Sequence, residues 1–148
     1  MSFGFAVSDF VAVGQLISDV ISSLKDSTGA AHQYRHLVLE LEGLHKALIE
    51  VDRLDGPEEL LPTINAIKAT ALNCRFPPRE FREKTKKYDA SLGVGNSAGR
   101  FKDAHMMVRW GVGKKEAVDE LRMKVNAHVG CISMFVGLFQ MRHSIPPY

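Results

Sequence analysis

Two glycine-containing stretches are the first residues of this 148-residue chain whose types and spacing could support chemistry. Residues 93–99 contain three glycines, as phosphate-binding loops do, but no strand-like segment precedes them and their spacing is not the dinucleotide fingerprint. Gly113-Lys114 could end a P-loop. However, Lys115 occupies the place of the metal-binding serine or threonine, and Val108 the place of the first glycine. We therefore expect no nucleotide site.

The histidines could in principle bind metal or act as bases. His32 and His36 stand four residues apart and would share a helix face, as zinc ligands often do, and Glu40 continues that face. No third ligand of suitable type lies nearby, so the solvated interpretation is favoured. Without a recognisable nucleophile or orienting partner, the sequence predicts no enzyme, cofactor, metal or small-molecule substrate. The same holds for the isolated histidines, which are His45, His105 and His128.

A basic run is the first surface that the sequence predicts. Only Glu80 and Glu83 oppose it, which leaves a local balance of +4. Such a helix could contact anionic lipid headgroups, where each base contributes about 1 kcal/mol. Nucleic-acid binding is less favoured because no base-reading motif is present, and the plainest alternative is a solvated helix paired with an acidic one at 31–54. The run comprises Arg75, Arg79, Arg82, Lys84, Lys86 and Lys87.

The apolar N-terminal segment is the second candidate surface. Core packing is favoured for it, and release to a membrane or a partner on activation is compatible with core packing. A signal peptide is not predicted because the first base is Lys25, and Asp9 and Asp19 interrupt any membrane span. We therefore expect a cytoplasmic chain, with recruitment to a membrane on activation as an option. The candidate contact residues are Phe3, Phe5, Phe10, Val13, Ile17, Val20 and Ile21.

Apolar residues recur at helical spacing through most of the chain, and no stretch alternates with a period of two. Breaks are expected at Pro77-Pro78 and at Gly111-Val112-Gly113, because prolines and paired glycines disfavour a helix interior. The final helix is apolar nearly all round over Val129–Phe139, so we expect it to be central or covered by a partner. The pattern predicts helices over about 9–26, 31–54, 58–73, 79–92, 101–110 and 114–141.

Composition is that of an ordinary globular domain, with 45% apolar and 24% charged residues. Cys74 and Cys131 lack metal-motif spacing and fit a reducing compartment. Charge is uneven: residues 1–60 carry ten acids and four bases, whereas residues 61–148 carry seven acids and fifteen bases. We predict an all-α, single-domain bundle of five or six helices over residues 1–142. The final helix is expected at its centre with the first packed along it, and residues 143–148 form a tail or linker.

Three separated stretches resemble a group of filamentous-fungal proteins. They are Met1–Phe10, Phe81–Gly93 and the segment from Trp110 through Val129. In that group the region is an N-terminal helical domain, often followed by a ubiquitin-like, ankyrin or NOD-like receptor (STAND) region. More distantly, the architecture is similar to the fungal HeLo and HeLo-like domains, in which a bundle with an apolar N-terminal segment permeabilises membranes.

This resemblance implies a non-enzymatic signalling or effector domain of a fungal immune-type protein, involved in programmed cell death or incompatibility. Its apolar first helix would act with the basic run at an anionic membrane or in self-association. The alternative is a protein–protein adaptor or regulatory domain without membrane activity, which binds through the Val129–Met141 face. In either case we expect a protein partner or a second copy.

Overall fold

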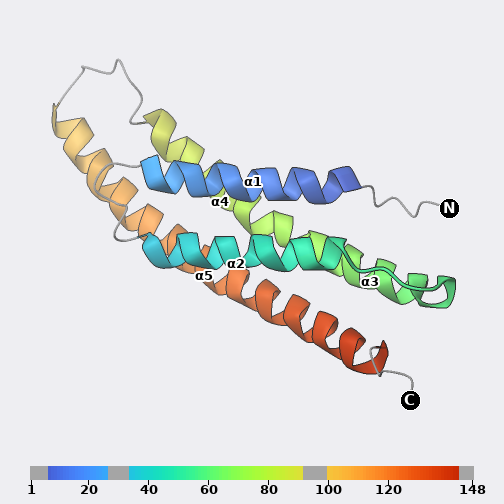
Figure 1. Ribbon diagram of the computed structural model, residues 1–148. Coiled ribbons are helices and arrows are strands. Elements are labelled where there is room, and N and C mark those ends of the chain that lie inside the picture. Colours follow the sequence, from blue (N-terminus) through green and yellow to red (C-terminus); the bar gives the residue numbers. More distant parts are fainter. Residues whose placement is uncertain (1–6, 27–33, 92–99, 144–148) are drawn as a thin grey trace.

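The computed structural model describes residues 7–26, 34–91 and 100–143, with side chains described for 9–25, 34–86 and 115–143. All-α architecture is confirmed within these ranges, because none of the described residues lies in a strand. Figure 1 shows helices in two crossed groups. The elements are α1 (Val7–Asp26), α2 (Arg35–Asp52), η1 (Glu58–Leu60), α3 (Leu61–Leu72), η2 (Asn73–Arg75), α4 (Phe76–Ser91) and α5 (Arg100–His143), where η marks a 3-10 turn.

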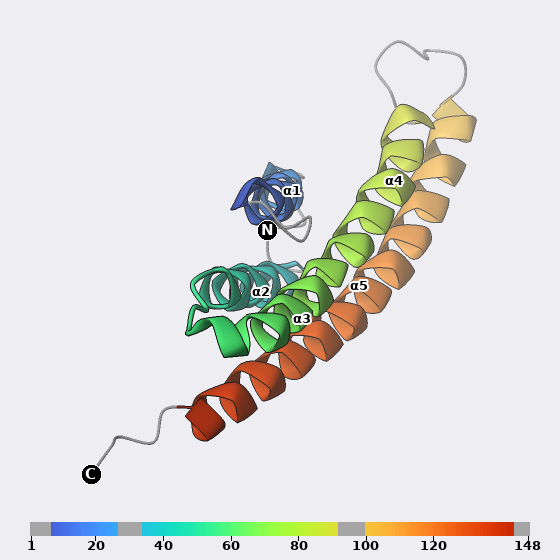
Figure 2. The ribbon, with the colours of Figure 1, turned by 90° about the vertical axis from the view of Figure 1, so that its right-hand side faces the viewer.

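The break predicted at Pro77-Pro78 is wrong. Residues 58–91 form an uninterrupted helical run, since η2 joins α3 directly to α4. Figure 2 shows this run as a curved rod beside α5. Pro77 and Pro78 are the second and third residues of α4, where a missing backbone N–H costs no intrahelical hydrogen bond. The chain therefore passes from α3 into α4 through η2 without a non-helical segment.

The break predicted at Gly111–Gly113 is also wrong, because α5 runs through these residues and is 44 residues long. Two interior glycines add about 2 kcal/mol to the cost of a helix, which the packing of the rest of α5 against three other helices outweighs. The predicted count of five or six separate helices is not confirmed. With both breaks absent, the described residues form four helical rods.

Helix α2 packs on α1, α3 and α5, and the central position predicted for the final helix is not confirmed. The buried residues of α2 follow steps of four and three, so they make a continuous apolar face. Both α1 and α5 pack on α2, and the α3–α4 run contacts α1 and α5 as well. The prediction that α1 lies along a central final helix is therefore not confirmed. The buried α2 residues are Leu37, Leu41, Leu44, Leu48 and Val51.

The apolar face of α1 was predicted correctly. Most of the residues proposed for it are buried in the main core, and Ile21 is partly buried against that core. Gly14 lets α1 approach α2 closely, because a Cβ at that position would lie 2.9 Å from Nε2 of His45. The buried α1 side chains are Phe10, Val13, Ile17, Val20 and Leu24.

Candidate anion-binding groove between α1 and α4

An open groove lies between α1 and α4 and has a volume of about 650 Å³. It brings together the two surfaces that the sequence predicted, because α1 forms one wall and the basic run forms the other. The α1 wall has apolar residues with Asp9 at its end. The lining residues are Asp9, Ala12, Val13, Leu16, Arg75, Arg79, Arg82, Glu83 and Lys86.

Helical spacing explains why these bases share one wall. From Arg75 the lining bases follow at steps of four, three and four residues, which keeps them on one helix face. Lys84 lies outside that period and points elsewhere. The side chain of Lys87 lies outside the described residues. The structure therefore places four of the six predicted bases in one groove.

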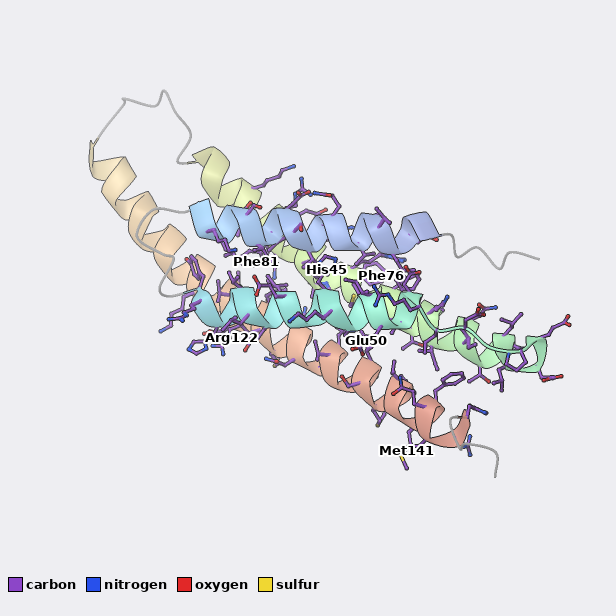
Figure 3. All side chains as sticks on the ribbon, in the orientation of Figure 1. His45, Glu50, Phe76, Phe81, Arg122 and Met141 are labelled. Atoms are coloured by element: carbon purple, nitrogen blue, oxygen red, sulfur yellow. The ribbon has the colours of Figure 1, made fainter. Side chains whose placement is uncertain are left out.

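An exposed aromatic ring stands beside the groove. Phe76, labelled in Figure 3, is 43% exposed and is the first residue of α4. The guanidinium carbon of Arg75 lies 4.7 Å from the ring centroid, and that of Arg79 lies 5.9 Å from it. A cation over an aromatic face gains about 0.5–1 kcal/mol at an exposed site. The ring thus restricts where the two arginines can place their charges.

The groove is positively charged overall. Among the described residues that line it, four bases face two acids, Asp9 and Glu83. Arg82 also meets Asp19 of α1, with Nη1 and Oδ2 3.7 Å apart. Arg75, Arg79 and Lys86 form no ion pair with a described carboxylate. Several donors thus remain available to an anion.

The opposite side of α4 is different, because its charges are matched across the contact with α5. Nζ of Lys84 lies 3.0 Å from Glu120, Lys124 lies 2.8 Å from Glu120, and Lys124 also reaches Glu80 at 3.2 Å. Hydrogen bonds from Lys124 and Lys84 lower the pKa of Glu120 to about 2. The alternative that the basic helix pairs with α2 is therefore corrected, since its described partners lie on α5 and α1.

The acidic α2 is instead paired with α5. Arg122 donates from Nε and Nη2 to the two carboxylate oxygens of Glu40, each at 3.0 Å. Burial alone would raise the pKa of Glu40, but hydrogen bonds from Arg122 and Asn126 outweigh it, and the pKa is lowered. This fork connects residues far apart in the sequence and positions α5 on α2.

The predicted contact residues of α1 fall into two groups. Phe10, Ile17 and Val20 are buried in the core, whereas Val13 is both buried and part of the groove wall. Phe3 and Phe5 lie outside the described residues. Most of the predicted contact face of α1 is therefore buried while α1 is docked, although Val11 is 64% exposed and apolar residues of α1 line the open groove.

An exposed apolar surface lies on α5. Met123, Met134, Leu138 and Met141 are all more than half exposed. The sequence indicated that Val129–Phe139 is apolar nearly all round and suggested Val129–Met141 as a binding face, but it did not separate the buried face of this segment from the exposed one. The seven-residue spacing of Met134 and Met141 was the signal that could have separated the two faces.

The other chemical candidates stay apart. Within the described ranges, no group of three or more histidine, cysteine, aspartate or glutamate residues is placed to hold a metal. His36 is exposed on α2, and its predicted companion His32 lies outside the described residues. Burial raises the pKa of the Cys74 thiol to about 12, so the thiolate that could act as a nucleophile is scarce.

A search for membrane spans among the described helices finds none that is long and apolar enough to cross a bilayer. Comparison with protein families, with proteins of curated function and with solved structures gives no match for this chain.

Proposed function

We propose that this chain is a non-enzymatic helical signalling domain that binds anionic membrane surfaces through the groove between α1 and α4. The observation that carries the proposal is the row of four bases along one open wall. A base near an anionic membrane contributes about 1 kcal/mol, so the four bases supply at most roughly 4 kcal/mol, which the two acids of the groove and the pairing of Arg82 with Asp19 reduce. The exposed ring of Phe76 adds an apolar contact beside these bases.

Binding is proposed for the folded domain, with α1 in place. Releasing α1 would remove five buried side chains from the core, each worth about 1.5–3 kcal/mol. Even if lipid reburied them, the side chains of α2 that pack against α1 would be left in water. The four bases supply too little energy to drive this release. Insertion of α1 therefore requires an additional activating event, and groove binding does not.

The resemblance to fungal N-terminal helical domains, and more distantly to HeLo-like domains, supports a signalling role in the cytoplasm. On the basis of this resemblance we propose that the domain belongs to an immune-type protein that controls cell death or incompatibility. The groove adds to this a specific way of reaching an anionic membrane without unfolding. A protein adaptor is the second candidate, and the exposed apolar residues of α5 favour it.

The test is co-sedimentation with vesicles of phosphatidylcholine, with and without phosphatidylserine. The Arg79→Ala, Lys86→Ala double variant removes two groove bases, and we expect it to partition roughly 30-fold less onto the anionic vesicles. The control is Lys46→Ala, Arg53→Ala, which removes two exposed bases of α2 outside the groove. Equal losses in both pairs would show that net charge, not the groove, attracts the membrane.

Two further readouts sharpen the test. Dye leakage should be absent under conditions where binding is complete, because α1 stays in the core. Inorganic phosphate should compete weakly, since a single anion meets fewer bases than a lipid surface does. Absence of binding to anionic vesicles at low salt would overturn the membrane proposal and leave the adaptor function.

A further inference from the structure

The exposed surface of α5 has a regular period that the groove does not explain. Six residues recur at steps of four, three, four, three and four, which is an unbroken heptad pattern. Five of them are exposed and Gly137 is half-exposed. This set, called here the α5 stripe, is Met123, Ala127, Gly130, Met134, Gly137 and Met141.

The α5 stripe lies on the face of α5 opposite to the one that packs on the bundle. Val125, Ile132 and Val136 of the same helix are buried, and each is about half a turn away from the stripe. Met141 is 75% exposed, and Figure 3 shows it pointing away from the other helices. A Cβ placed on Gly130 or Gly137 would meet nothing within 4 Å. The stripe thus alternates protruding methionines with bare backbone.

Between the bases at its two ends, the α5 segment that carries the stripe has no formal charge. Residues 125–141 contain no aspartate, glutamate, lysine or arginine, although both ends of this segment are flanked by bases. Burial lowers the pKa of His128, so its imidazole is neutral at pH 7. Seventeen uncharged residues on a helix with one exposed face are typical of a contact surface and not of a solvated one.

We propose that a second copy of this chain packs antiparallel on the α5 stripe. The reason is that the stripe is complementary in shape to a second stripe that runs in the opposite direction, with the two copies aligned at residue 132. Each bulky methionine near the centre then meets a glycine of the other copy, and two small residues allow close approach beside it. From the centre outward the facing pairs are Met134–Gly130, Ala127–Gly137 and Met123–Met141.

This reversal also satisfies the layer geometry of an antiparallel coiled coil. Along the stripe the heptad positions d and a alternate, beginning with d at Met123. The reversal pairs each d residue of one copy with an a residue of the other copy. A parallel, in-register arrangement would instead place Met134 on Met134 and Gly130 on Gly130. All three methionines would then meet methionines and both glycines would meet glycines, whereas the reversed arrangement pairs two methionines only in the outermost layer, Met123–Met141. Shape therefore selects the antiparallel arrangement.

The small area of the stripe limits how tightly two copies can bind. From Met123 to Met141 it is about 27 Å long at 1.5 Å per residue, and one helix is about 10 Å wide. This area is smaller than the roughly 800 Å² per partner of a standard stable interface. We therefore expect a reversible dimer with a micromolar dissociation constant. Self-association does not depend on the groove, because the two surfaces share no residue.

Analytical ultracentrifugation of the 148-residue chain from low to high micromolar concentration tests the proposal. The mass should rise from that of the 16.4 kDa monomer toward twice that value. Met134→Glu places two like charges near the centre and should weaken dimerisation at least tenfold. Leu39→Glu is the matched control, because Leu39 is 57% exposed on α2 and Met134 is 54% exposed. Circular dichroism checks that both variants keep the wild-type helix content.

A monomer at every concentration would overturn the proposal, as would an equal loss with Leu39→Glu. Cross-linking tests the direction in a Cys131→Ser background, with Cys74 buried and unreactive. Chains with Met123→Cys and chains with Met141→Cys should form mixed disulfide dimers when combined, and few dimers when oxidised separately. Like-with-like cross-linking would overturn the antiparallel arrangement.

Discussion

Both sides of α4 carry basic residues, but these residues have different roles on the two sides. Toward α5, Lys84 meets a carboxylate at 3.0 Å and joins a network with Glu120 and Lys124. Toward α1, the bases line an open groove and outnumber the acids that line it. Lys84 and Lys86 are only two positions apart, yet Lys84 is matched by a carboxylate and Lys86 is not matched by any described one. Proximity to a carboxylate, not the charge itself, distinguishes a structural base from one available to a ligand.

The largest expected effect is a difference in stability between substitutions on the two faces of α1, the helix that forms one wall of the groove. Ile17→Ala removes a fully buried side chain and should lower the free energy of unfolding by about 2–5 kcal/mol. Leu16→Ala, one residue earlier on the groove wall, should cost less than about 1 kcal/mol. Urea denaturation followed by circular dichroism measures both. Similar losses would mean that the groove wall is itself part of the core.

A charged contact that belongs to neither side of α4 gives the next largest effect. Arg122→Met removes both hydrogen bonds to Glu40, which is the less exposed partner, and should cost about 1–2 kcal/mol. Arg142→Met, at the exposed end of α5, should cost almost nothing. Urea midpoints compare the two variants. Equal midpoints would show that the fork adds no stability.

The comparison between Lys84 and Lys86 can be tested directly. Lys84→Met should lower the free energy of unfolding by about 0.2–1 kcal/mol, as expected for an exposed pair. Lys86→Met should leave stability unchanged and reduce binding to anionic vesicles. The same two preparations are used for urea denaturation and for co-sedimentation. A reversed result, with binding lost in the Lys84 variant, would contradict the assignment of the two sides.

The smallest expected effect concerns acid. The pKa of Glu120 is about 2 in the fold and 4.5 for an ordinary glutamate, so its favourable contribution is complete above pH 4.5. The contribution is lost as the pH falls from 4.5 toward 2. Glu120→Gln should therefore lose less stability than the wild type over this range, as measured by urea midpoints. Glu58→Gln, which removes a carboxylate of η1, serves as the control and should follow the wild type.

Local periodicity was enough to predict the helical class and the buried face of α1. It failed where a break depended on context. Pro77 and Pro78 look like a stop, but they fall in the first turn of α4, and the sequence alone does not reveal the 3-10 turn before them. The predicted break at Gly111 and Gly113 rested on local helix propensity, whereas the packing of α5 on other helices is a tertiary property.

The candidate groove was half predictable. The basic run and the α1 segment were both identified, and the four-three-four spacing of the bases was readable. Their juxtaposition was not, because it depends on α1 packing against α4 and not along α5. The division between matched and unmatched bases also depends on Asp19 and Glu120, which lie far away in the sequence.

The paired hydrogen bonds between Arg122 and Glu40 affect how α5 is aligned along α2. A smooth apolar contact between two long helices permits sliding by one turn, since leucine-like residues recur at each turn. If α5 slid by one turn toward either end, Glu40 would face Asn126 or the neighbourhood of Asp119 instead of Arg122. Facing Asn126, the half-buried carboxylate of Glu40 would have no counter-ion. Near Asp119, two carboxylates would lie close together. The pairing of Arg122 with Glu40 thus favours one axial position of α5 on α2 over those one turn away.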